Sequence, residues 1–341
     1  MIETVLGPIP ADQAGRVSMH DHLLADARML SAPAAATGVD GLPAADDPVT
    51  IETLGFLHWN LLALADNLVL DDPVLAADEL RRAADLGQGT MVDLTSWGLG
   101  PSPAELPAIA RAAGMNVVAG CGVYLDRPHP DWIASRSTGE LTDLFLGALE
   151  SELEPGCGFA AGILGVIGTG EPLTDSEERV LLAVAEAAGR SGAAITVRID
   201  AGARRGLELL ARIEAAGCPP AQVIFGNVDE YIDVPYHREL AAAGATLEWC
   251  FGNEARLRKG LREPADEERL AALLELLADE AMAERCVLGC SVWTKTQLRA
   301  YGGMGYDHLL RRIVPALYGG GTSEASVEAI LVSNPARLLD R

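Results

Sequence analysis

Short apolar runs alternate with amphipathic stretches along most of the chain. Eight runs have the length of a β-strand, from RVSMHDH (16–22) at the start to RCVLGCS (285–291) near the end. The six between them are GTMVDLTS (89–96), MNVVAGCG (115–122), AGILGVIG (161–168), AAITVRI (193–199), AQVIFGN (221–227) and ATLEWCFG (245–252). Runs that are apolar throughout are typical of parallel strands buried on both faces.

Nearly every predicted strand is followed by a stretch with helical periodicity. The clearest stretches are 102–114, 174–192, 204–217 and 264–282, and others begin near 235 and 306. Thr174 and Glu177 have the spacing of a capping box at the start of one of these helices. Eight strand–helix units predict an α/β protein with a (β/α)8 TIM barrel, formed by a single domain over residues 1–341.

One segment departs from the alternation. SAPAAATGVDGLPAADDPVT (31–50) follows the first predicted strand and is irregular and rich in Pro, Ala and Gly. It falls inside the first strand–helix unit, so it is not a domain linker. We expect a long loop over the mouth of the barrel.

Charge and composition exclude several kinds of partner. The 341 residues are 49% hydrophobic and carry a net charge of −23, which argues against nucleic acid and anionic membranes. No apolar run approaches the roughly 20 residues needed to span a bilayer, and the N-terminus does not resemble a signal peptide. The six cysteines are scattered without a CxxC pair, which indicates reduced core thiols. We expect a cytoplasmic protein that acts on a small molecule.

A TIM barrel carries its active site where the strands end at their carboxyl side. The side chains to weigh there are therefore those at the ends of the eight runs: His20, His22, Asp93, Thr95, Tyr124, Val166, Arg198, Asn227, Asp229, Glu248, Cys250, Cys290 and Ser291. His20 and His22 fall on one face of their strand because side chains alternate with period two. A His-x-His pair of this kind commonly opens a metal site.

Four longer segments resemble the phosphotriesterase family of the amidohydrolase superfamily. They are TVLGPIPADQAGRVSMHDHLL (4–24), AGILGVIGTGEPLTDSEERVL (161–181), TKTQLRAYGGMGYDHLLRRIVPAL (294–317) and ILVSNPARLL (330–339). The resemblance runs nearly end to end. It implies a TIM barrel with a short N-terminal hairpin, hydrolase activity, a homodimer and two divalent metal ions.

The metal ligands of that family are largely replaced. The resemblance places the two strand-1 histidines at His20 and His22. The bridging lysine or glutamate of strand 4 falls on Val166, or on Gly165 if the register slips by one. The histidines of strands 5 and 6 and the aspartate of strand 8 correspond, in turn, to Arg198, Asn227 and Ser291. Four of the six ligand positions therefore lack their expected ligand.

A cation at one ligand position makes the loss more serious. A guanidinium stays charged, and at about 4 Å it repels a dication by roughly 8 kcal/mol for an effective dielectric constant near 20. We therefore expect no binuclear centre and no cofactor. A single zinc ion on His20 and His22 remains an alternative, with a third ligand from Cys290, Cys250, Asp229 or Glu248. Arg198 would then pair with Asp229 or Glu248.

The remaining side chains have both functional and structural interpretations. His20 and His22 are either acid/base groups or remnants of the metal site. Arg198 is a clamp for an anionic substrate or an internal salt bridge, and Asn227 donates to an oxyanion or fills space. Ser291 is a candidate nucleophile. The substrate-binding candidates near them are Tyr124, Trp97, Trp293, Asp229, Glu248, Cys250 and Cys290, of which Cys290 is also a second possible nucleophile.

Three functions remain open at this point. The first is a metal-independent enzyme that acts on a small anionic or carbonyl-containing molecule by histidine acid/base chemistry. The second is an ester or lactone hydrolase with a rebuilt single-metal site. The third is a non-catalytic binding protein or inactive paralogue. The missing ligands weaken the second, but they do not separate the first from the third.

Overall fold

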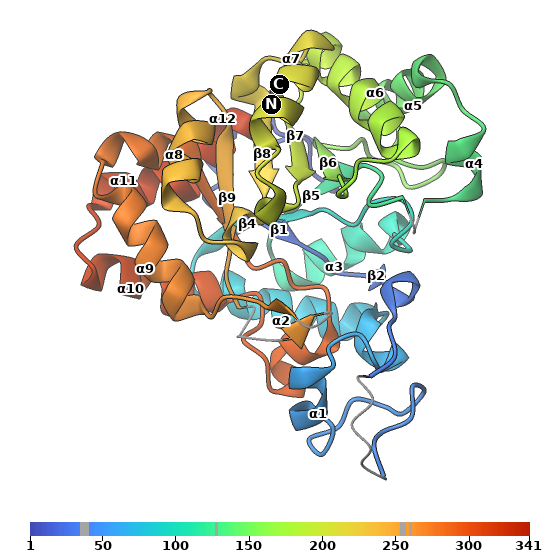
Figure 1. Ribbon diagram of the computed structural model, residues 1–341, viewed down its shortest axis with the longest axis vertical. Coiled ribbons are helices and arrows are strands. Elements are labelled where there is room, and N and C mark those ends of the chain that lie inside the picture. The colour runs from blue at the N-terminus through green and yellow to red at the C-terminus, as the bar shows by residue number, and fades with distance from the viewer. Residues whose placement is uncertain (35–40, 127–128, 253–256, 259–260) are drawn as a thin grey trace.

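Eight parallel strands form the centre of the molecule (Figure 1). The computed structural model describes residues 1–34, 41–126, 129–252, 257–258 and 261–341. The strands follow one another around the sheet in the order β1 (Arg16–Asp21), β4 (Gln88–Asp93), β5 (Asn116–Cys121), β6 (Ile163–Gly168), β7 (Ile195–Arg198), β8 (Val223–Gly226), β9 (Thr246–Cys250) and β12 (Cys286–Gly289). Seven of them lie within a predicted run, and β4 begins one residue before its run.

The sheet closes between its first and last strands. The amide groups of Cys290 and Ser291 donate to the carbonyl of His20, at 3.2 and 2.7 Å. The amide of His22 donates in return to the carbonyl of Val292 at 3.0 Å. These bonds join the carboxyl ends of β1 and β12, and the predicted TIM barrel is confirmed.

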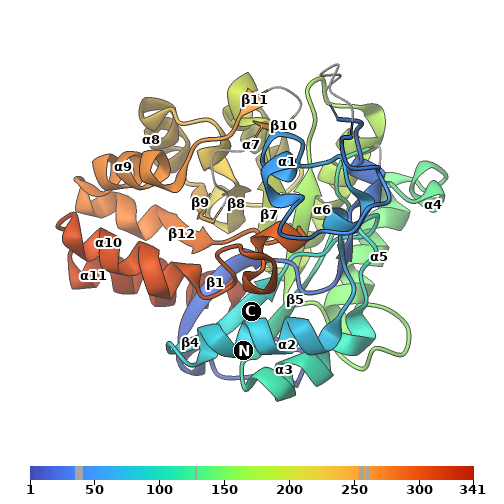
Figure 2. The ribbon, with the colours of Figure 1, turned by 90° about the horizontal axis from the view of Figure 1, so that it is seen from below.

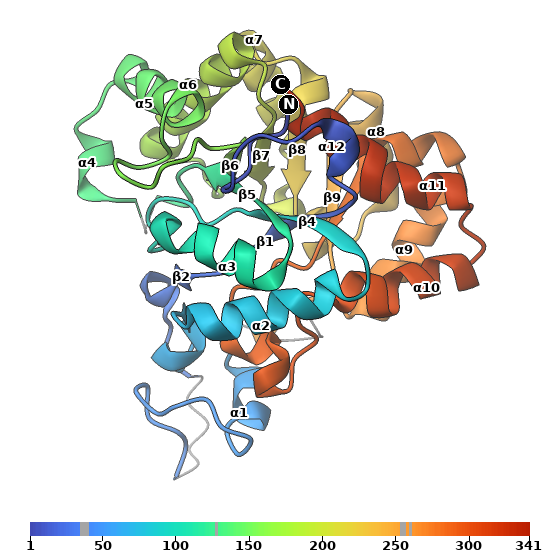
Figure 3. The ribbon, with the colours of Figure 1, turned by 180° about the vertical axis from the view of Figure 1, so that it is seen from behind.

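Helices surround the strands, as the view in Figure 2 shows. They are α1 (Leu54–Trp59), α2 (Pro73–Ala84), α3 (Leu106–Ala113), α4 (Asp131–Ala134), α5 (Thr138–Glu150), α6 (Asp175–Ser191), α7 (Gly206–Ala215), α8 (Val234–Ala242), α9 (Asp266–Leu277), α10 (Val314–Gly319), α11 (Glu324–Glu328) and α12 (Asn334–Leu339). Figure 3 shows α2 and α3 side by side on the outside of the barrel. The predicted capping box is present: Glu177 N donates to Thr174 Oγ1 and Thr174 N donates to Glu177 Oε2, at 3.2 and 3.1 Å. None of the helices within the described ranges is long and apolar enough to cross a bilayer.

Neighbouring residues of the strands pack into two apolar clusters. Met91, Val117 and Phe225 belong to a cluster that extends into the surrounding helices. Val92, Val118 and Ile224 belong to a second cluster that includes Val166. Since successive side chains of a strand point to opposite faces, both faces of each strand are buried. This is why most of the strands are almost continuously apolar.

The two ends of the barrel are finished differently. At one end, Ile2 and Ile9 exchange backbone hydrogen bonds of 2.8 and 2.9 Å, which forms the expected N-terminal hairpin. The segment after β1 projects from the opposite end (Figure 1). It contains β2 (Ala25–Asp26), which pairs antiparallel with β3 (Val69–Leu70), and α1. Residues 41–50 form no helix or strand there, as predicted, whereas residues 35–40 of the expected loop lie outside the described residues.

Candidate active site

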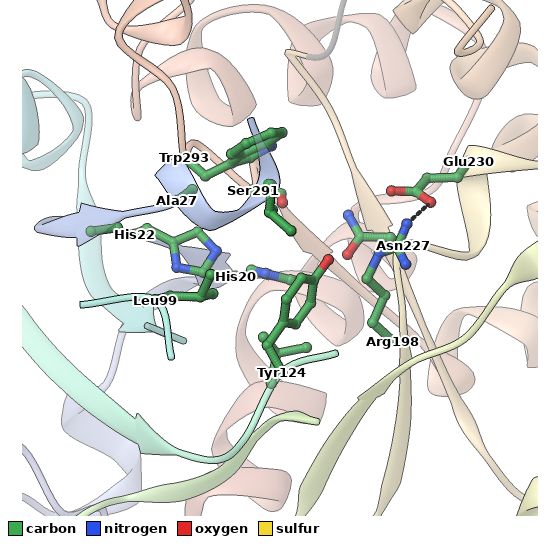
Figure 4. A pocket seen from close by; sticks show the side chains of 13 residues that line it. His20, His22, Ala27, Leu99, Tyr124, Arg198, Asn227, Glu230, Ser291 and Trp293 are labelled. Atoms are coloured by element: carbon green, nitrogen blue, oxygen red, sulfur yellow. Dashed lines mark hydrogen bonds and ion pairs between the residues drawn. The ribbon is translucent and has the colours of Figure 1, made fainter. Parts of the chain in front are cut away.

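A pocket with about 530 Å³ of empty space, including its open mouth, lies at the carboxyl ends of the strands (Figure 4). It is lined by His20, His22, Ala25, Ala27, Leu30, Leu99, Tyr124, Val166, Arg198, Asn227, Glu230, Ser291 and Trp293. His22 stands at one side of the pocket, and Arg198 with Asn227 stands at the other. The pocket therefore joins the end of the first strand to the ends of β7 and β8.

His20 contacts the buried carboxylate of Glu248, which does not line the pocket. Its Nδ1 lies 2.8 Å from Oε2 of Glu248, and both side chains are almost completely buried. A carboxylate only accepts hydrogen bonds, so Nδ1 carries the proton of this bond. Glu248 does not line the pocket whereas His20 does, which leaves Nε2 as the ring nitrogen on the pocket side.

Two glycines make room for this pair. A Cβ atom at Gly289 of β12 would lie 2.8 Å from Cβ of His20, and one at Gly226 of β8 would lie 2.9 Å from Glu248 Oε2. Contacts this short require the atoms to move. The missing side chains on the two neighbouring strands therefore allow His20 and Glu248 to meet inside the barrel.

His22 has a neutral partner instead. Its Nδ1 lies 3.1 Å from the hydroxyl of Thr95, and its ring meets that of His20 edge to face at 5.3 Å between centroids. Asp93, also at the end of β4, accepts hydrogen bonds from the amides of Leu23 and Thr95, at 2.9 and 2.8 Å. Asp93 thus fixes the loops around the histidines.

The two histidines differ in their electrostatics. Burial opposes the charged form of His20, but the charge and hydrogen bond of Glu248 outweigh it, so the pKa of His20 is raised. Burial lowers the pKa of His22 well below its usual value, and the nearby His20 lowers it further. Burial therefore favours the neutral form of His22, whereas Glu248 favours the protonated form of His20.

Arg198 forms an ion pair with Glu230, which also lines the pocket. Their side chains are 14% and 19% exposed. The predicted pairing of Arg198 with Asp229 or Glu248 is wrong, because these two carboxylates have other partners. Asp229 Oδ2 lies 3.0 Å from Nε of the buried Arg269, and Glu248 holds His20.

Three further ligand positions of the sequence comparison also face the pocket. Val166, rather than Gly165, lines it, so an apolar side chain stands at the bridging position. Asn227 and Ser291 line it as well, and both have left-handed backbone conformations, with φ of 54° and 47°. Asparagine tolerates this conformation better than serine does. The turn at Ser291 directs the chain from β12 back across the end of β1.

One side of the pocket is apolar. Tyr124 and Trp293 line it as expected, together with Leu30 and Leu99. Trp97 does not line the pocket. It stacks on Phe145 at 5.8 Å and donates from Nε1 to Glu154 at 3.1 Å.

Four other predicted site residues lie beneath or behind the pocket wall. Asp229, Glu248, Cys250 and Cys290 are fully buried and none lines the pocket. Burial raises the pKa of the Cys290 thiol well above its usual value, and nearby carboxylates raise it further, so a reactive thiolate is disfavoured. Glu230 was missed from the sequence, although it lies three residues after Asn227 in the acidic pair Asp229–Glu230, at the end of a predicted strand.

The residues present do not fit a binuclear metal centre. The bridging position holds Val166, and the position of the strand-5 histidine holds the cation of the Arg198–Glu230 pair. Another group of possible ligands is present: His20, Glu248 and Cys250 each offer one ligand atom, and these atoms lie within 4.8 Å of one another. Oε1 of Glu248 is buried without a hydrogen-bond partner among the described residues.

Comparison with known proteins agrees with the architecture. A sequence model of the Phosphotriesterase family matches residues 1–339. N-acetyltaurine hydrolase of Danio rerio is 31% identical over 344 residues, which cover 99% of this chain and 97% of that protein. The Homo sapiens protein of the same name is 28% identical over 346 residues, with the same coverage.

Two solved structures are also similar. A resiniferatoxin-binding protein from Rhodobacter sphaeroides has a TM-score of 0.94 and 31% identity, covering 99% of this chain and 94% of its own. A phosphotriesterase homology protein from Escherichia coli, solved with phosphate in its active site, has a TM-score of 0.77 and 26% identity, covering 96% of this chain and 100% of its own.

Proposed function

Since this chain belongs to the phosphotriesterase family, we propose that it is a hydrolase that works without the family's binuclear metal centre. His20 acts as the general base and acid, and the substrate is a small molecule with a carbonyl group, an amide or an ester. The observation that carries the proposal is the buried contact of 2.8 Å between His20 Nδ1 and Glu248.

The contact with Glu248 orients His20 for proton transfer. The carboxylate fixes the proton on Nδ1, so the lone pair of Nε2 is available on the pocket side. Nε2 takes a proton from a water molecule as the water oxygen attacks the carbonyl carbon. The imidazolium that forms is stabilised by Glu248, and it then gives its proton to the departing amine or alcohol. A positioned base of this kind contributes about 10²- to 10⁴-fold in rate.

The other side of the pocket supplies positive polarity. Arg198 and Asn227 stand there, opposite His22 (Figure 4). The attack of water converts the carbonyl oxygen to an oxyanion, which needs donors that are already in place. Guanidinium and amide N–H groups serve this purpose. Glu230 keeps Arg198 at the pocket wall and partly neutralises its charge, which makes a purely anionic substrate less favourable than we expected from the sequence.

The names of two relatives support a small amide as the substrate. N-acetyltaurine is a small amide that carries a sulfonate, and two proteins about 30% identical to this chain bear its hydrolysis in their names. The pocket has a polar half around His20 and Arg198 and an apolar half with Leu30, Leu99 and Trp293. We infer that the scissile carbonyl lies in the polar half and that an acyl or other apolar group lies against the apolar half.

A single-metal ester or lactone hydrolase is less well supported. A catalytic metal keeps one coordination position open to the substrate. The ligand group that the chain offers consists of His20, Glu248 and Cys250. Two of these residues do not line the pocket, and His22 does not take part.

A non-catalytic binding protein is the second candidate, because the apolar half of the pocket suits ligand binding and one similar structure is named as a binding protein.

The proposal is tested with chelator-treated protein whose metal content has been measured by elemental mass spectrometry. We expect well under two metal ions per chain before treatment, and unchanged hydrolysis of N-acetyltaurine or of a related N-acyl or ester probe after it. Glu248→Gln should lower kcat by about 10²-fold or more, since an amide does not stabilise the imidazolium. Activity that disappears on chelation and returns with metal contradicts the metal-free mechanism. Absence of turnover with bound probe indicates the binding protein.

A further inference from the structure

We propose that His20, Glu248 and Cys250 form a buried three-residue site for one thiophilic divalent cation such as Zn²⁺, and that an ion bound there inhibits the protein. The site lies directly beneath the pocket and shares only His20 with the ligand positions of the family. The binding itself is independent of the proposed function, whereas the inhibition rests on it.

The three ligand atoms have nearly the spacing that zinc requires. His20 Nδ1 and Glu248 Oε2 are 2.8 Å apart, Glu248 Oε2 and Cys250 Sγ are 3.8 Å apart, and all three atoms lie within 4.8 Å of one another. Tetrahedral zinc with ordinary bond lengths separates such ligands by roughly 3.4–3.6 Å. The His–Glu pair therefore has to open by roughly half an ångström, and Cys250 has to approach.

An unpartnered oxygen of Glu248 also supports this cation site. Oε1 of Glu248 is completely buried and has no hydrogen-bond partner among the described residues, so this carboxylate is only half satisfied. Such an atom is costly in a barrel interior unless a donor or a cation meets it, and an ion that Glu248 binds through both oxygens would meet it. Bound Zn²⁺ together with one carboxylate, one thiolate and a neutral imidazole has no net charge. Neutrality favours a site that is fully enclosed.

The thiol of Cys250 favours thiophilic ions over Mg²⁺ and Ca²⁺. Burial and the neighbouring Glu248 raise the pKa of Cys250 well above its usual value, so the free protein holds a protonated thiol. A bound ion has to displace this proton. Thiophilic ions such as Zn²⁺ gain enough from a bond to sulfur, whereas Mg²⁺ and Ca²⁺ prefer oxygen.

An ion in this site removes the general base. Metal on Nδ1 displaces the proton that Glu248 accepts, and the remaining ring proton of the neutral imidazole is then on Nε2. Nε2 faces the pocket and no longer accepts a proton from water. Added zinc should therefore slow this protein, which is the opposite of its effect on a metal-dependent hydrolase.

Binding is tested with Co²⁺ as a spectroscopic substitute for zinc on the chelator-treated full chain. We expect one equivalent to bind, with a thiolate-to-cobalt absorption band in the near ultraviolet. Cys250→Ser and Cys250→Ala should both lose the band and bind at least about 100-fold more weakly, since changes outside the ligand shell already cost up to that much. Cys157→Ser, a half-buried cysteine on a distant loop, should keep it. A band that survives in both Cys250 variants, or is absent from the wild type, overturns the site.

Inhibition is measured separately on the hydrolysis of the same probe. We expect the wild-type rate to fall as Zn²⁺ fills one site and to return with chelator. Each Cys250 variant, compared with its own metal-free rate, should resist the same Zn²⁺ concentration. If the cobalt band is present but zinc leaves the rate unchanged or raises it, the metal site stands and both the inhibition and the proposed role of His20 are wrong. If the band is absent and His20→Asn is inactive, only the metal site fails.

Discussion

The two sides of the barrel mouth differ in what stands at the family's metal positions. On the β1 side both histidines are present; His20 is held by Glu248 and His22 by Thr95. On the β7–β8 side the histidines are replaced by Arg198 and Asn227, and Glu230 neutralises the arginine. The first side keeps groups that exchange protons, and the second has fixed charges. In the function we propose, proton transfer belongs to the β1 side, and the other side orients the substrate and stabilises charge.

The β1 side itself contains an informative contrast. His20 and His22 are two residues apart, line the same pocket and are both buried. A carboxylate beside His20 raises its pKa, whereas His22 lies beside the hydroxyl of Thr95 and has its pKa lowered by burial and by His20. The partner, rather than the residue type, decides which histidine can act as a base.

The largest expected effect comes from replacing the two histidines one at a time. His20→Asn should lower kcat/KM by about 10²- to 10⁴-fold, the usual contribution of a positioned base. His22→Asn should lower it by less than about 10-fold, because a neutral imidazole at the pocket wall supplies at most one hydrogen bond. Steady-state rates on chelator-treated protein measure both, and circular dichroism checks the fold. Equal losses in the two variants would contradict the assignment of His20 as the base.

The barrel and much of the pocket could be predicted from the chain. The strands were recognisable because both faces of each are buried, which makes most of the runs almost continuously apolar. Residues at strand ends followed from the fold, and so did the position of His20, His22, Arg198, Asn227 and Ser291 around one pocket. The resemblance to a known family supplied the ligand positions, which periodicity alone does not reveal.

Partners were harder to predict than positions. Glu248 reaches His20 across β12, which requires the small residues Gly289 and Gly226 at two other strands. Nothing in the local sequence around Glu248 records that geometry. Trp97 was expected at the pocket because it follows a strand end, but its ring turns outward to Phe145. Side-chain direction after a strand depends on the loop, and the loop conformation is set by contacts distant in sequence.

A smaller effect concerns folding stability on the charged side, which should depend on pH through His237. His237 of α8 lies 3.2 Å from the carbonyl of Val228, in the turn that carries Glu230, and burial lowers its pKa to about 4. In the unfolded chain its pKa is about 6.5, so below pH 6.5 the unfolded state binds a proton that the folded state refuses. Folding stability should therefore fall as the pH drops from 6.5 to 4, by about 3 kcal/mol from this residue.

Urea denaturation at several pH values measures the effect of His237. His237→Gln retains an N–H donor for Val228 but does not titrate, so the difference between the two proteins isolates the histidine. As the pH falls, the free energy of unfolding should decrease more for the wild type than for His237→Gln. A gap that stays constant from pH 7 to pH 4 would show that His237 titrates normally in the folded protein.

The smallest expected effect tests whether the charged side is structural or functional. Arg198→Ala leaves Glu230 without the partner seen here, and because both side chains are 14–19% exposed the loss in unfolding free energy should be about 2 kcal/mol, between the values for surface and buried pairs. Glu230→Ala should cost a similar amount, and the double variant should lose less than the sum of the two single losses. Denaturation of the wild type and the three variants measures these changes.

The kinetic part of the test compares kcat with KM. If Arg198 stabilises the oxyanion, the single variant loses kcat beyond what Glu230→Ala loses, because Glu230→Ala retains the guanidinium. Identical kinetics in the two single variants would make the Arg198–Glu230 pair structural, and the proposed catalysis would then rest on the β1 side alone.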